Sequence, residues 1–117
     1  MNGRADDLPR ALARFLAAYE AQPALVSEQR GWSPIIALEA TDTRARIAVA
    51  LADGRVAGVG QADDATLEIS GELRTLCDVL ELRRDPNEPY LFGELVVRGA
   101  EADFVRLDYI ASRLCPR

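Results

Sequence analysis

The sequence predicts an α+β domain in which helices precede and follow the strands of a five-stranded, mostly antiparallel sheet. Apolar residues recur at helical spacing in the segments 8–21, 73–82 and 101–114. They alternate with other residues at several places between positions 35 and 70, and again at 94–98, which is the period of a strand. Asp53-Gly54, between two alternating runs, is a strong hairpin signal. A chain of 117 residues fits one core, so we expect a single domain over 1–117.

The first helix is expected over 8–21. Asp6 and Asp7 precede it, where a capping side chain and a negative charge both favour a helix N-terminus. Pro23 cannot continue this helix but fits the first turn of a new one, so a short helical piece should follow and reach about Arg30. The apolar stripe of the first helix consists of Leu8, Leu12, Phe15, Leu16 and Tyr19.

Four strands are expected in the middle of the chain. The first two cover 35–40 and 46–51, and the third returns from the Asp53-Gly54 turn over 56–60. Gly58 and Gly60 in this third strand indicate a bulge or a close approach. The fourth strand covers 65–70. Because short turns join successive strands, we expect an antiparallel meander.

The second half predicts helix, loop, strand and helix. The helix from Ser70 or Gly71 ends before Asp85-Pro86, and the segment 86–93 should form a loop or one-turn helix with its aromatic edge, Tyr90 to Phe92, turned inward. A fifth strand over 94–98 is stopped by Gly99. The final helix, 101–114, should bury Phe104, Leu107, Ala111 and Leu114 and expose Glu101, Asp103 and Arg106.

Composition excludes several functions. The net charge of −5 gives no general attraction to nucleic acid or to an anionic membrane, so we expect no nucleic-acid partner. The chain has no histidine, and Cys77 and Cys115 fit no metal-binding spacing, so we expect neither metal nor cofactor. We find no signal peptide and no run of about twenty apolar residues. These features predict a cytoplasmic protein with reduced thiols and no stable membrane insertion.

The order of the elements resembles the sterol-carrier-protein type-2 domain family across nearly the whole chain. The segments that carry the likeness are the strand 65–69, the helix 73–82, Asp85-Pro86, Phe92 and the strand 95–99 with its terminal glycine. The spacing from Arg84-Asp85-Pro86 to Phe92 is similar to the bacterial branch that assists ubiquinone synthesis. The resemblance implies helices on one face of the sheet and, between the two layers, an apolar tunnel that accepts fatty acyl chains, sterols or isoprenoid lipids.

We therefore expect a protein that binds and carries an apolar lipid without catalysis and that could present it to biosynthetic enzymes. Such a ligand needs a concave site lined by aliphatic and aromatic side chains, and each buried methylene is worth about 0.8 kcal/mol. An ordinary core would use the same inward positions. The candidate lipid-binding residues are Ile36, Leu38, Ile47, Val49, Leu67, Ile69, Leu76, Leu80, Phe92, Phe104, Leu107 and Leu114.

Other interpretations stay open at this point. The chain could be an assembly or regulatory module with a vestigial pocket, whose partner is a second copy or a biosynthetic enzyme. It could also be an enzyme that works without histidine, in which Asp85 or Glu94 beside an apolar pocket acts as acid or base. Trp32, at the start of the sheet, could gate a tunnel or close the core. Tyr90 and Tyr109 could meet a lipid head group or turn outward.

Overall fold

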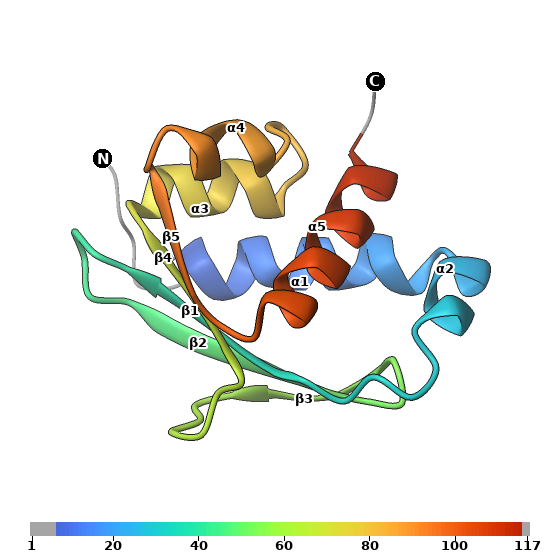
Figure 1. Ribbon diagram of the computed structural model, residues 1–117. Coiled ribbons are helices and arrows are strands. Elements are labelled where there is room, and N and C mark those ends of the chain that lie inside the picture. The colour runs from blue at the N-terminus through green and yellow to red at the C-terminus, as the bar shows by residue number, and fades with distance from the viewer. Residues whose placement is uncertain (1–6, 116–117) are drawn as a thin grey trace.

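Five helices lie on one face of a five-stranded sheet in the computed structural model, which describes residues 7–115 (Figure 1). The elements follow in the order α1 (Asp7–Glu20), α2 (Pro23–Glu28), β1 (Ile35–Ala40), β2 (Arg46–Ala52), β3 (Arg55–Gly60), β4 (Leu67–Gly71), α3 (Leu73–Leu80), α4 (Asn87–Leu91), β5 (Leu95–Gly99) and α5 (Glu101–Leu114). This confirms the predicted fold class and the place of each element. Asp6, the expected helix cap, lies outside the described residues.

The sheet has the order β3-β2-β1-β4-β5, and this corrects the expected meander. β1, β2 and β3 are antiparallel neighbours, but β4 crosses to the other side of β1 and pairs with it in parallel. β3 is mostly exposed, which suits a sheet edge, whereas Leu67 and Ile69 of β4 are buried beside Ile36 and Leu38 of β1. The burial of these residues thus accounts for the position of β4 inside the sheet. The residues of the turn before β4 do not predict which strand it pairs with.

The predicted hairpin and bulge are both present. Ala52 pairs with Arg55, and Asp53 and Gly54 have φ values of 54° and 82°, as a two-residue turn requires. The register between β2 and β3 shifts after Ala50, which is the bulge that Gly58 indicated. The Tyr19 hydroxyl donates a 2.6 Å hydrogen bond to the Gly54 carbonyl and so ties the end of α1 to this hairpin. Burial raises the pKa of that phenol.

The segment after α3 differs from expectation. α4 begins at an Asx turn, in which the Asn87 amide donates to Asp85 Oδ1 at 2.9 Å, and it turns Pro89 inward. Because Pro89 occupies the buried side of this short helix, the residues at its end face outward. Phe92 is 76% exposed and Leu91 is 73% exposed, so the prediction of an inward aromatic edge is wrong.

α5 is the most lightly buried of the long helices. It buries only Ile110 and Ala111 completely, whereas α1 buries six residues. Within residues 7–115, no helix has the length and hydrophobicity that crossing a bilayer requires.

Candidate lipid-binding site

An apolar cavity of about 70 Å³ lies between the sheet and the helices. Its floor comes from β1, β2, β4 and β5, and its roof comes from α1, α3 and α5. The predicted residues that line it are Ile36, Leu38, Val49, Ile69, Leu76, Leu80 and Leu107. Trp32, for which the sequence left a tunnel gate and a core position open, also lines it. The lining residues that sequence reasoning missed are Leu12, Phe15, Leu16, Tyr19, Leu51, Val79, Leu95, Ile110 and Ala111.

The remaining predicted residues lie elsewhere. Ile47 and Leu67 are buried in the core outside the cavity lining, and Phe104 and Leu114 are partly buried and pack against the core. Phe92 is on the surface, which corrects its expected position between the layers. A signal for the missed roof residues was present, because the apolar stripe of 8–21 was recognised as a buried helix face but was not extended to the site.

The polar atoms at the cavity wall are bonded away from it. Trp32 is nearly buried and lines the cavity, and its Nε1 donates to Asp103 Oδ1 at 2.9 Å. The Tyr19 hydroxyl donates its hydrogen bond to the Gly54 carbonyl. The cavity therefore offers aliphatic and aromatic surface. Such a surface suits a hydrocarbon and provides no free hydrogen-bonding group for a polar substrate.

The first half of α5 is held by four residues that we name the α2–α5 clasp: Gln29, Trp32, Asp103 and Arg106. Besides the Trp32–Asp103 bond, Arg106 donates to Gln29 Oε1 at 3.0 Å and lies 5.5 Å from the centre of the Trp32 ring. Gln29 is buried, and its Nε2 donates to the Leu25 carbonyl. Asp103 and Arg106 thus turn toward the protein, which corrects their expected outward positions, because the buried indole and amide need partners.

The two carboxylates considered for catalysis do not line the cavity. Glu94 accepts hydrogen bonds from Arg84, the shorter at 3.1 Å, and Asp85 accepts from the Asn87 amide. Cys77 has a pKa raised to about 11, first by burial and then by the carboxylates of Glu81, Asp7 and Asp78, so its thiol is protonated at neutral pH. Among residues 7–115, no three potential ligands are grouped as a metal site.

Asp108 on α5 has an unusual environment for an acidic group. It follows Leu107 on α5, and its Oδ1 is buried without a hydrogen-bond partner within the described part of the chain. Burial raises the pKa of the Asp108 carboxyl, and the Asp85 carboxyl raises it further. The ionised form of Asp108 therefore destabilises the folded state.

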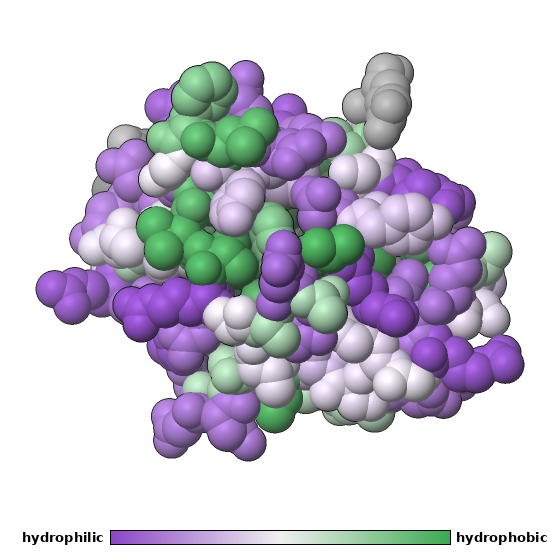
Figure 2. Space-filling model, viewed as in Figure 1, coloured by the Kyte–Doolittle hydropathy of each residue, from purple (hydrophilic) through white to green (hydrophobic). Residues whose placement is uncertain are grey.

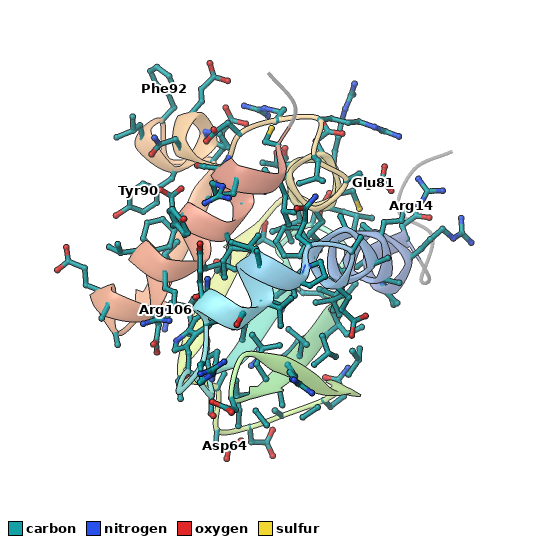
Figure 3. The ribbon with its side chains drawn as sticks, turned by 90° about the vertical axis from the view of Figure 1, so that its right-hand side faces the viewer. Arg14, Asp64, Glu81, Tyr90, Phe92 and Arg106 are labelled. Atoms are coloured by element: carbon teal, nitrogen blue, oxygen red, sulfur yellow. The ribbon has the colours of Figure 1, made fainter. Side chains whose placement is uncertain are left out.

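Asp108→Asn is expected to raise the melting temperature at pH 7. The pKa of Asp108 is higher in the folded chain than in the unfolded chain, so its ionisation costs stability above the folded pKa and costs nothing below the unfolded pKa. Asparagine is neutral throughout. Thermal unfolding from pH 7 to pH 3 should show the gain shrinking toward zero, with the exposed Asp64→Asn as control (Figure 3). A gain that is independent of pH would contradict this assignment.

Comparison with known proteins finds the fold but no close relative. No protein-family model matches the sequence, and no match was found among curated proteins. The solution structure of the sterol carrier protein domain 2 of Helicoverpa armigera is 12% identical, with a TM-score of 0.68 over 100% of this chain and 96% of that one. A UbiJ-SCP2 ubiquinone synthesis protein is 18% identical, with a TM-score of 0.58 over 80% of each chain.

A much larger protein contains the same fold as a part. The sec-alkylsulfatase Pisa1 from Pseudomonas sp. is 17% identical with a TM-score of 0.59. The match covers 79% of this chain but only 14% of the sulfatase. Together with the likenesses above, this shows that the chain has the fold of sterol-carrier-protein type-2 domains.

Proposed function

We propose that this domain, which has the sterol-carrier-protein type-2 fold, binds one apolar lipid between its sheet and its helices and carries it without chemical change. The observation that carries the proposal is the cavity itself, whose lining residues come from four strands and three helices as well as Trp32 and are hydrophobic throughout. Burying a chain of ten methylenes there would contribute roughly 8 kcal/mol before the costs of association. That is enough for useful affinity.

The cavity must enlarge to take such a guest. Its volume of about 70 Å³ is several-fold below the roughly 300 Å³ of a small ligand pocket. α5 is the element best suited to move, because it buries only two residues completely and places Leu107, Ile110 and Ala111 over the cavity. The clasp would hold the first half of α5 while the second half moves away from the sheet.

An isoprenoid quinone precursor is the ligand class that we favour among acyl, sterol-like and isoprenoid lipids. The support is the similarity to the UbiJ-SCP2 protein, whose name refers to ubiquinone synthesis. Two features argue against catalysis: neither Asp85 nor Glu94 lines the cavity, and the Cys77 thiol is protonated. Presentation of the bound lipid to a biosynthetic enzyme would be the use of such a carrier.

The test is to identify what the protein holds. Native mass spectrometry of freshly purified protein, followed by organic extraction, should show one lipid per chain. After the lipid is stripped, adding palmitic acid or a short polyprenol should raise the melting temperature, because a ligand that binds only the folded state stabilises it. A chain that carries no lipid, and whose melting temperature neither compound changes, would refute the proposal.

A further inference from the structure

The outer side of α4 and β5 carries exposed apolar side chains that the proposed cavity does not use. We name this surface the α4–β5 patch: Tyr90, Leu91, Phe92 and Val96. All four are exposed, and Leu91 and Phe92 are exposed to about three-quarters. Figure 2 shows hydrophobic residues gathered over α4 and β5 on the viewed face, and Figure 3 shows Tyr90 and Phe92 protruding from one side of the molecule. Neighbouring large apolar residues on a surface usually mark an interaction site.

The patch is continuous with the roof of the cavity. The Tyr90 ring packs against the Phe104 ring of α5, with 4.7 Å between centroids and 39° between the ring planes. One turn after Phe104 along α5, Leu107 lines the cavity, and Leu95, next to Val96, lines it from β5. A lipid that leaves the cavity between α4 and α5 would therefore emerge at the patch.

The charges around the patch select the kind of surface it fits. Arg84 pairs with Glu88 at 3.2 Å and with Glu94 at 3.1 Å, so two carboxylates neutralise its charge. Asp85 lies beside this trio, and the exposed Arg98 follows Val96 by two positions on β5, so two arginines stand against three carboxylates around the patch. With this local excess of acid and a net charge of −5 on the chain, an anionic surface would be repelled. A zwitterionic surface, which carries no net charge, would not be repelled.

We infer that the α4–β5 patch docks the protein on a zwitterionic lipid surface, with Leu91 and Phe92 inserted, so that lipid passes between membrane and cavity. This inference rests on the proposed function. A lipid surface suits the patch better than a protein does, because a bilayer accepts apolar side chains without a matched shape or hydrogen-bond partners. Two inserted side chains give weak, reversible binding, as a shuttle needs.

The experiment compares wild type with the double variant Leu91→Ser/Phe92→Ser. Both residues are exposed, so the fold should be kept. Flotation with phosphatidylcholine vesicles should recover wild type and recover the double variant about tenfold less. Val59→Ser is the matched control, because Val59 is 53% exposed on β3, the opposite edge of the sheet, and should leave flotation unchanged.

Two further measurements separate the inference from its alternatives. Equilibrium binding of palmitic acid from solution should be the same in wild type and double variant, whereas transfer of a fluorescent fatty acid between vesicles should slow. Light scattering should give a monomer mass for both proteins. The inference is overturned if wild type does not float, if the double variant floats equally well, if it loses affinity for free palmitic acid, or if the patch proves to join two copies. Failure of the proposed function would show separately, as no palmitic acid bound by wild type.

Discussion

Ala111→Phe is expected to weaken lipid binding strongly while leaving the melting temperature nearly unchanged. Ala111 is buried on α5 and lines the cavity, so a larger side chain there occupies the space that a lipid needs. Filling an existing void of about 70 Å³ returns up to about 2 kcal/mol, at roughly 24 cal/mol per Å³, which offsets strain from the added ring. Titration with a fluorescent fatty acid should show affinity falling by at least about tenfold, equivalent to roughly 1.4 kcal/mol.

A graded series makes the cavity-filling test independent of folding. Ala111→Leu adds a smaller side chain and should reduce uptake less than phenylalanine does. Ala17→Phe is the control, because Ala17 is exposed on α1 and away from the lining. If Ala111→Leu lowered the melting temperature strongly, the space would already be filled by core. If both variants bound lipid like wild type, the guest would lie elsewhere.

Gly99→Ala is expected to destabilise the protein more than any other single-methyl change proposed here. Gly99 has a φ of 131°, a conformation that side chains rarely allow, and an added Cβ would lie 2.3 Å from the Thr66 carbonyl oxygen. Gly99 also pairs with Leu67, so backbone movement would disturb β4. The cost should be at least about 3 kcal/mol, a fall in melting temperature of roughly 10 °C or more.

Gly58→Ala is the matched control for this prediction. Gly58 also lies in a strand, but its φ is not positive, and beyond its two neighbours in the chain an added Cβ would meet no atom within 4 Å. Its melting temperature should change by little, since exposed substitutions usually stay within about 0.5 kcal/mol. Equal melting temperatures for the two variants would show that the close approach at Gly99 is not a constraint. The glycine that ends β5, one of the residues that carried the family likeness, thus has a physical role.

The elements followed from local patterns, but their arrangement did not. The stripe from Leu8 to Tyr19 and the Asp53-Gly54 turn each depend on residues close in sequence, so both were predictable. The position of β4 beside β1 depends on burial among distant strands, which no local period records. Likewise, Pro89 took the inner side of α4 and left Phe92 outside.

The lining of the cavity was predictable where it coincided with the inward period of a strand or helix. Ile36, Leu38 and Leu76 line the cavity for this reason. The clasp was not predictable, because the helical pattern places Asp103 and Arg106 on the solvent side of α5. Only the structure shows that they bond the Trp32 indole and the buried Gln29. Polar pairs between distant segments leave no spacing signal in one sequence.

A crystal structure of the protein with bound palmitic acid would show whether the lipid occupies the space between the sheet and the helices. In that structure the hydrocarbon should lie between the sheet and α5, in contact with Ile36, Leu38 and Ala111, and the second half of α5 should have moved outward. Palmitic acid bound on the outer surface, with the cavity still about 70 Å³ and α5 unmoved, would contradict this prediction.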